Sequence, residues 1–362
     1  MTAQDISGAP IPRQHHAALP YLPELDFLRA IAVLGVLYAH FWTESSVLGT
    51  LGVKLFFVLS GFLITDILLG LRQSDCALAT PLPRLVNFFI RRALRIWPAY
   101  YLLLGLLIIA NFQNIRDVAG WHLMFASNIL FAVRNEHLPW ATSPWWSLSV
   151  EEQFYLLWPA VMLLPPFRAI PWIIGLLIYA GILFEFGVFH SGYTGLGAYY
   201  LPPAAFLALG TGALLSFLRF RHGSIPTIVE RMGWAALPLV VLLTVTSRID
   251  WTWGVLSVVS MAAMVTWGAR GGSVWARRIT RSPPMLWIGR RSYGIYLYHV
   301  PLLAIWFSFI PEEHFLHPRG PLLFAAGLAT SLAVAGLSWA IVEGPANRLK
   351  RLFPYRSQRP TA

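Results

Sequence analysis

The first apolar stretch of the sequence contains two residues that could act together chemically, Arg29 and His40. Ionisable groups inside membrane-length apolar stretches are expensive, so each is a candidate functional residue. The eleven-residue spacing is close to three helical turns, which puts both side chains on one helical face, about 16 Å apart along the axis. Such a face would line a pore or tunnel, with His40 past mid-membrane. Two other interpretations stay open: Arg29 as an interfacial anchor paired with Asp26, and His40 as a hydrogen-bonded packing histidine.

Two adjacent carboxylates, Glu151 and Glu152, open a later apolar run. Residues four apart share a helical face, so Ser147, Glu151 and Tyr155 would line up while Glu152 points elsewhere. A carboxylate that faces His40 would fix its tautomer and make it a usable general base. The alternative is an acidic cap at the start of the helix, which the helix dipole favours.

Three arginines, Arg91, Arg92 and Arg95, stand in an amphipathic stretch over 84–96. Clustered guanidinium groups suit phosphate capture, although a basic loop that binds anionic lipid gives the same pattern. His299 is expected near mid-membrane, either as a catalytic residue or as a residue that packs through its ring nitrogens.

One apolar run, 51–71, contains a lysine and a pair of small residues. Lys54 is expected to pair with a carboxylate of the helix over 145–164 or to reach the membrane interface. Ser60 and Gly61 form no nucleophile motif, and they indicate close packing between helices through small residues.

A membrane helix bundle must position these groups. Of the 362 residues, 57% are hydrophobic and 12% are charged, whereas a soluble domain has about 25% charged residues. The apolar residues come in blocks of about 20, the length that spans a bilayer. We predict an all-α integral membrane protein with ten transmembrane helices, over about 27–43, 51–71, 97–112, 145–164, 169–187, 199–218, 235–248, 252–268, 288–309 and 321–342.

The formal net charge of +11 comes mainly from arginines in alternate connections between these blocks. Under the positive-inside rule this asymmetry favours ten spans, with both termini cytoplasmic, and a weak block over 118–133 that does not span. We expect that block to be re-entrant or interfacial, because irregular backbone is tolerated where it lines a cavity. The same placement of charge argues against nucleic acid as a partner.

The predicted domain organisation is a polar N-terminal tail over 1–23, a membrane domain over 24–346 and a basic cytoplasmic tail over 347–362. The N-terminal tail lacks the regions of a signal peptide. The single cysteine, Cys76, permits no internal disulfide, and no cysteine and histidine set has zinc spacing. No P-loop, dinucleotide glycine fingerprint or HExxH motif is present, so no metal is expected.

Several motifs, ordered along nearly the whole chain, resemble the acyltransferase-3 family of integral membrane acyltransferases. They are LDFLRAIAV at 25–33 followed by His40, LFFVLSGFLI at 55–64, FIRRALRIWPAY at 89–100, WSLSVEEQFY at 146–155, GRRSYGIYLYHVP at 289–301 and VEGP at 342–345. Each motif alone is weak, and the ordered set is highly specific.

The resemblance implies transfer of an acyl group, usually acetyl from acetyl-CoA as co-substrate, to a hydroxyl of a cell-surface glycan or lipid-linked saccharide. It implies a bacterial inner-membrane protein whose donor arrives from the cytoplasm. In the family, the residues that match Arg29 and His40 are catalytic or essential, and those that match Arg92 and Arg95 are associated with the donor. The position of Lys54 is often acidic in the family. No hydrolase-like extracytoplasmic domain follows, so a stand-alone member is expected.

The resulting hypothesis is a membrane O-acetyltransferase with a divided site. The phosphates of coenzyme A dock on the three arginines of 84–96, and the pantetheine arm enters the bundle. His40, held by Glu151 or Glu152, either deprotonates the acceptor hydroxyl or takes the acyl group itself. Arg29 orients the donor or stabilises developing negative charge. The secondary candidates are Asp26, Tyr155 and His299.

The alternative class is a proton-coupled transporter or flippase, which also needs intramembrane arginine, histidine and carboxylate groups. Two features count against this class. The arginine cluster is confined to one side of the membrane, and the sequence has no internal repeat of the kind found in many transporters.

Overall fold

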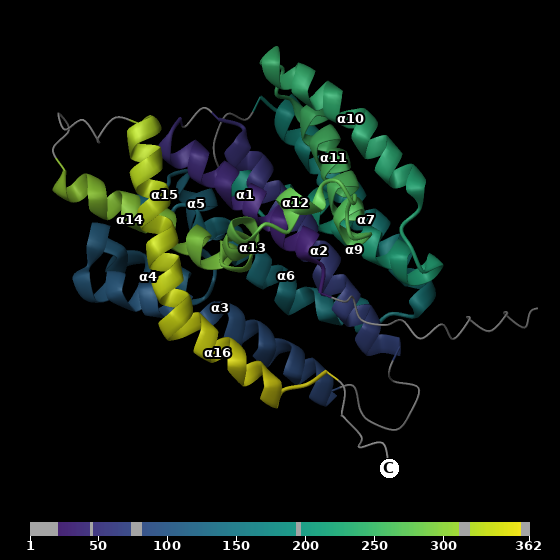
Figure 1. Ribbon diagram of the computed structural model, residues 1–362, viewed down its shortest axis with the longest axis horizontal. Coiled ribbons are helices and arrows are strands. Elements are labelled where there is room, and N and C mark those ends of the chain that lie inside the picture. Colours follow the sequence, from purple (N-terminus) through teal and green to yellow (C-terminus); the bar gives the residue numbers. More distant parts are fainter. Residues whose placement is uncertain (1–20, 44–45, 74–81, 193–196, 311–318, 356–362) are drawn as a thin grey trace, which may run out of the picture.

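The computed structural model describes residues 21–43, 46–73, 82–192, 197–310 and 319–355, and within these ranges all regular elements are helices (Figure 1). This confirms the prediction of an all-α membrane protein. Residues 1–20 of the predicted N-terminal tail and 356–362 of the predicted C-terminal tail lie outside the described residues, as does Cys76.

The long helices are joined by short helical turns. In chain order the elements are α1 (Pro23–Phe41), α2 (Leu48–Gln73), α3 (Leu82–Ala110), η2 (Phe112–Val118), α4 (Ala119–Leu123), α5 (Ser127–Arg134), η3 (Trp140–Thr142), α6 (Trp145–Leu163), η4 (Phe167–Ala169), α7 (Ile170–His190), α8 (Gly197–Tyr200), α9 (Pro203–His222), α10 (Thr227–Val245), α11 (Trp251–Ala269), α12 (Arg277–Thr280), α13 (Pro283–Arg290), α14 (Ser292–Phe309), α15 (Pro321–Ser338), η5 (Trp339–Glu343), α16 (Gly344–Arg348) and η6 (Leu349–Leu352).

Seven helices in the described ranges are long and apolar enough to cross a membrane: α2, α3, α7, α9, α10, α11 and α15. Three more helices, α1, α6 and α14, have 18 or 19 residues, close to the span length of about 20. These three coincide with predicted spans and contain candidate site residues, whose polarity lowers their hydropathy. The protein therefore surrounds its most polar long helices with more apolar ones, such as α7, of whose span window only 11% is buried.

The weak block over 118–133 forms two short helices, α4 with five residues and α5 with eight. Neither approaches the length of about 20 residues that crosses a bilayer. Two of its polar side chains have partners within the protein: His122 Nε2 contacts Thr142 at 2.7 Å, and Ser127 contacts Ser149 at 2.8 Å. Irregular backbone is thereby kept away from lipid, as the hydrocarbon region requires.

Helix α3 begins at Leu82, so the Arg-rich stretch over 84–96 is continuous with the span and is not a separate segment before it. Pro98, the second residue of the predicted span over 97–112, lies inside this longer helix. A proline in a membrane helix is tolerated because neighbouring groups satisfy the freed carbonyl. The predicted helix over 288–309 is likewise divided at Arg291 into α13 and α14.

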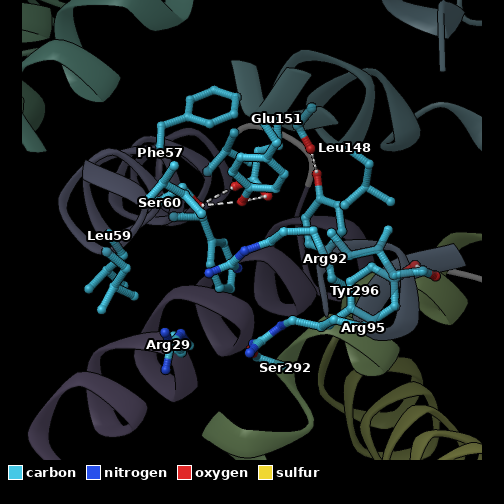
Figure 2. A pocket seen from close by; sticks show the side chains of 18 residues that line it. Arg29, Phe57, Leu59, Ser60, Arg92, Arg95, Leu148, Glu151, Ser292 and Tyr296 are labelled. Carbon is cyan, nitrogen blue, oxygen red and sulfur yellow. Dashed lines mark hydrogen bonds between the residues drawn. The ribbon is translucent and has the colours of Figure 1, made fainter. Parts of the chain in front are cut away.

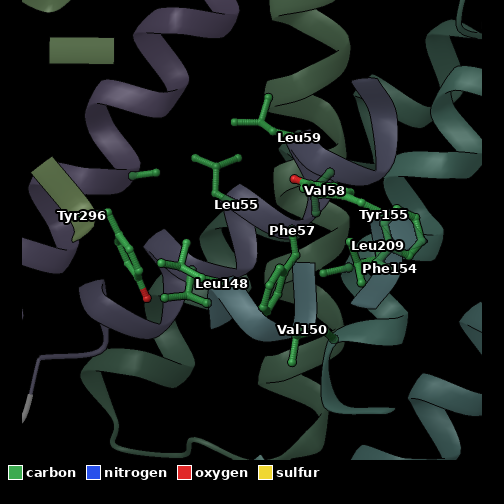
Figure 3. Packing of buried hydrophobic residues seen from close by; sticks show 14 of the residues in the cluster. Leu55, Phe57, Val58, Leu59, Leu148, Val150, Phe154, Tyr155, Leu209 and Tyr296 are labelled. Atoms are coloured by element: carbon green, nitrogen blue, oxygen red, sulfur yellow. The ribbon is translucent and has the colours of Figure 1, made fainter. Parts of the chain in front are cut away.

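The core of the bundle lies around α1 and α2. Helix α1 contacts α2, α11, α13, α14 and α15, and α2 packs most extensively on α9. Figure 3 shows Val58 of α2, Leu209 of α9 and Phe154 of α6 among the buried residues of this core. The close approach of α2 and α9 depends on small residues, because a Cβ atom added to Gly61 would lie 2.1 Å from the Leu209 carbonyl oxygen. The predicted close packing through small residues is confirmed at Gly61.

Replacement of this glycine tests the packing. We expect Gly61→Ala to lower the free energy of unfolding by about 1–3 kcal/mol, because the added methyl group must push the α9 backbone away. Gly70→Ala, in the same helix but with no atom within 4 Å of its added Cβ, is the matched control. Thermal unfolding of both variants in lipid nanodiscs, followed by tryptophan fluorescence, measures the difference; equal stability would contradict the close-packing account.

Candidate active site

A polar pocket opens among α1, α2, α3, α6 and α14, and three guanidinium groups line it (Figure 2). Arg29 comes from α1, and Arg92 and Arg95 come from α3. The pocket also includes Glu151 of α6 and Tyr296 of α14. Three cationic groups beside one carboxylate leave an excess of positive charge, which suits an anionic ligand such as a phosphate ester.

Arg29 is held in place by Asp26, one turn earlier on α1. Arg29 Nη1 lies 2.6 Å from Asp26 Oδ1, and the Tyr21 hydroxyl donates to Asp26 Oδ2 at 2.8 Å. The side chain of Arg29 is 17% exposed. Pairing with Asp26 and a place in the lining of the pocket were alternative interpretations of Arg29. They are compatible, because the ion pair with Asp26 fixes an arginine that also lines the pocket.

The three arginines of α3 divide into two groups. Arg92 and Arg95 line the pocket, and the guanidinium carbon of Arg92 lies 5.6 Å from the centre of the Tyr155 ring. Arg91 faces elsewhere: it donates to the carbonyl oxygen of Lys350 at 2.6 Å and stacks 4.5 Å from the centre of the Tyr355 ring. Of the three arginines predicted to bind the donor, Arg92 and Arg95 line the pocket together with Arg29, and Arg91 contacts the C-terminal segment instead.

Glu151 is fixed through both of its carboxylate oxygens. Ser60 donates to Glu151 Oε1 at 2.8 Å, and the Tyr155 hydroxyl donates to Glu151 Oε2 at 2.9 Å. Tyr155 therefore lies on the same helical face as Glu151, as the four-residue spacing predicts. A fully hydrogen-bonded carboxylate beside Arg92 and Arg95 balances part of their charge and holds the pocket open.

Glu152 points to the other side of α6. Trp97 Nε1 donates to Glu152 Oε2 at 3.1 Å, and among the described residues Glu152 Oε1 is buried without a hydrogen-bond partner. Glu152 lines a neighbouring pocket between α3 and α6 that it shares with Arg92. Neither Glu151 nor Glu152 hydrogen-bonds to His40 in the described ranges, so the expected carboxylate–histidine pair is replaced by the contacts above.

His40 lies against a second histidine. The rings of His40 and His299 are 4.8 Å apart between centroids and meet edge to face. His40 Nδ1 lies 3.0 Å from the Val36 carbonyl oxygen, and His299 Nδ1 lies 2.6 Å from the Tyr296 carbonyl oxygen. Because a carbonyl only accepts, each Nδ1 bears the proton and each Nε2 is the basic nitrogen. His299 Nε2 is buried and, within the described residues, makes no hydrogen bond.

Tyr296 connects this histidine pair to the arginine pocket. Its ring lines the pocket, and its centroid is 5.4 Å from that of His299. Its hydroxyl contacts Ser147 Oγ at 2.7 Å, which joins α14 to α6. His40 itself does not line the pocket. The site therefore extends along α1, from Arg29 in the pocket to His40 about three turns further on.

Sequence reasoning missed several polar pocket residues, among them Ser60 and Tyr296. Ser60 was assigned to packing alone, although a hydroxyl within an apolar run is itself a signal of a buried polar partner.

Lys54 was expected to pair with a carboxylate of α6 or to reach the interface, but it pairs with Glu185 of α7 at 2.8 Å. In the portion of the chain that the structure describes, no group of three histidine, cysteine or acidic residues has the geometry of a metal site.

Comparison with known proteins identifies the family to which this chain belongs. The family model described as "Acyltransferase domain" matches residues 22–340, which include every pocket residue above. The chain belongs to the acyltransferase-3 family. No solved structure matches the chain.

Curated relatives cover most of this chain. The peptidoglycan O-acetyltransferase OatA of Listeria monocytogenes is 28% identical, over 90% of this chain and 56% of that protein. The Bacillus subtilis protein YrhL, provisionally named a peptidoglycan O-acetyltransferase, is 28% identical over 81% of this chain and 50% of that protein. This acyltransferase-3 chain thus spans about half the length of the curated relatives it matches.

The place of Arg91 outside the pocket can be tested directly. Arg91→Gln removes the guanidinium stacked on Tyr355 and weakens the contacts with two carbonyl groups, so we expect the segment over 349–355 to become sensitive to protease. Limited proteolysis with mass spectrometry measures the cleavage. Arg351→Gln, which alters an exposed arginine on the same segment, is the control. Protection equal to wild type in Arg91→Gln would contradict the fastening role.

Proposed function

We propose that the protein is a multi-pass membrane O-acetyltransferase that moves an acetyl group from acetyl-CoA to a hydroxyl of a cell-surface glycan or lipid-linked saccharide. The observation that supports it most is the convergence of Arg29, Arg92 and Arg95 on one pocket. Tyr296 lines this pocket and contacts His299, the neighbour of His40. The family match and the names of the relatives favour the same chemistry.

The arginine pocket would bind the donor. Phosphate groups of coenzyme A suit the guanidinium groups of Arg92 and Arg95, which the pocket holds beside Glu151. Arg29 lies about three helical turns from His40, roughly 16 Å along the axis. That separation assigns Arg29 to donor orientation, because it is too far from His40 to stabilise an oxyanion formed there. The pantetheine arm then extends past Tyr296 towards the histidine pair.

His40 would act as the general base through Nε2. It removes the proton of the acceptor hydroxyl while the oxygen attacks the thioester carbonyl carbon. Collapse of the tetrahedral intermediate breaks the carbon–sulfur bond, and the coenzyme A thiolate receives the proton from His40. His299 would stabilise the protonated ring of its neighbour, because its own Nε2 is an acceptor. No step needs a metal ion.

The orientation in the membrane is part of the proposal. The positive-inside rule puts the Arg-rich start of α3 at the cytoplasmic face of a bacterial inner membrane, where acetyl-CoA is available. His40, near the end of α1, then lies towards the opposite face. A transporter would not need a donor pocket of this charge or a histidine pair behind it.

The first test measures transfer of radiolabelled acetyl from acetyl-CoA in membranes that contain the wild-type chain, His40→Ala or Arg95→Ala. His40→Ala removes the base and is expected to reduce transfer about 10²- to 10⁴-fold. Arg95→Ala removes a donor contact and is expected to raise the KM for acetyl-CoA. His190→Ala, an exposed histidine at the end of α7, is the control. Full activity of His40→Ala at equal expression would contradict the proposed mechanism.

A second test separates the two histidines. We expect His299→Gln to lower kcat about 10-fold or more while the KM for acetyl-CoA is retained, because the substitution removes the acceptor nitrogen beside His40 and leaves the arginine pocket intact. His122→Gln alters another fully buried histidine, which pairs with Thr142, and is expected to keep its kcat. An unchanged kcat in His299→Gln would leave His299 with a packing role alone.

A further inference from the structure

A second polar cleft lies at the opposite end of α2 from its C-terminal arginine, among α2, α7, α8, α9 and α11. Lys54 and Glu185 stand at its centre, and Asp250 lies at the start of α11. Trp251 and Tyr199 add aromatic rings to its wall. None of these residues belongs to the arginine pocket.

The cleft is built around an ion pair. Lys54 Nζ and Glu185 Oε1 are 2.8 Å apart, and the two side chains are 13% and 15% exposed. Gly254 makes room for the pair, because an added Cβ would lie 2.2 Å from Glu185 Oε2. Lys54 Nζ also lies 5.8 Å from the centre of the Trp253 ring. A charged pair between membrane helices is costly and usually functional, and the mechanism above does not use it.

Only one helix and one indole ring separate this cleft from the arginine pocket. Val53 and Phe57 of α2 line the pocket, whereas Lys54 lines the cleft. The ring of Trp146 contacts both sides, at 6.0 Å from Phe57 and 4.8 Å from Tyr199. The cleft therefore adjoins the site on the side away from the Arg-rich start of α3.

The cleft also lies at the same end of the bundle as His40. It includes Val47 and Thr50 at the start of α2, and that start packs on the end of α1. An added Cβ on Gly49 would lie 2.9 Å from the Cβ of Ala39, the residue before His40. A ligand in the cleft is thus near the proposed base and far from the proposed phosphate contacts.

We propose that this cleft binds the saccharide end of the acceptor, an oligosaccharide. The proposal rests on the O-acetyltransferase function above. A carboxylate and an ammonium group together accept from and donate to sugar hydroxyls, and aromatic rings pack on the apolar face of a pyranose. The cleft has two carboxylates, Glu185 and Asp250, and one ammonium group, Lys54. This excess of negative charge disfavours binding of the anionic donor. The donor and the acceptor would therefore approach the histidine pair from opposite ends of the bundle.

The test uses the full chain in nanodiscs and chitotetraose, a soluble β-1,4-linked tetramer of N-acetylglucosamine, as the probe. Saturation-transfer NMR measures binding, and steady-state kinetics measures the KM of each substrate. We expect Lys54→Met and Glu185→Gln to raise the Kd and KM for the tetrasaccharide about 10-fold or more, while the KM for acetyl-CoA is retained. Trp251→Ala is expected to weaken binding of the same probe.

The matched control is Asp66→Asn, which breaks a second ion pair of α2, with Arg219 of α9, outside the cleft. It is expected to leave the Kd for the tetrasaccharide unchanged. The double variant Lys54→Glu/Glu185→Lys distinguishes an ion pair that binds sugar from one that only holds α2 against α7. If the pair only ties α2 to α7, the exchanged charges restore binding, and this result would overturn the proposal. If the pair binds sugar, the exchange does not restore the affinity.

The assays distinguish failure of the cleft proposal from failure of the proposed O-acetyltransferase function. No binding of chitotetraose by the wild-type chain would overturn the cleft proposal, whatever the acetyl-CoA assay shows. Binding of chitotetraose without turnover of acetyl-CoA by the wild-type chain would overturn the O-acetyltransferase function and leave a saccharide-binding cleft.

Discussion

The free-energy cost of placing polar and charged groups in hydrocarbon determines how the helices of this protein are arranged. An ionised side chain that faces lipid is strongly unfavourable, so each such group must find a partner inside the bundle. Arg29 has Asp26, Glu151 has Ser60 and Tyr155, and Lys54 has Glu185. Most of these groups come from α1, α2 and α6. Of the span window of α2, 67% is buried, whereas only 11% of that of α7 and 17% of that of α10 are buried.

Helix α2 separates two polar spaces with different chemistry. On one side it borders a pocket rich in guanidinium groups, and on the other a cleft with an ion pair and aromatic rings. It can do so because its small residues allow close packing on α9 at Gly61, while Val53 and Lys54 point in different directions. Neighbouring residues on one helix thus serve two sites that need opposite electrostatic environments.

Helix α1 sets the distance between the parts of the proposed site. A straight helix fixes the separation of Arg29 and His40 more firmly than a loop would, because its rise per residue is constant. Phosphate contacts at one end and a base at the other suit a donor with a long arm between its anionic groups and its thioester. Tyr296 and His299 of α14 lie between the two ends, with ring centroids 5.4 Å apart, and the His299 ring contacts that of His40.

The sequence by itself determined the helical class, the positions of the long helices and the non-spanning block over 118–133, because hydropathy and length decide which segments suit a bilayer. It also identified Arg29, Arg92, Arg95, Glu151 and His40 as polar residues in membrane-length helices that are worth testing. Tertiary structure alone decided their partners. His40 packs against His299, Arg91 contacts the C-terminal segment, and Lys54 pairs with Glu185, 131 residues away. Spacing along one helix specifies which residues share a face, but which helix that face meets depends on how all the helices pack together.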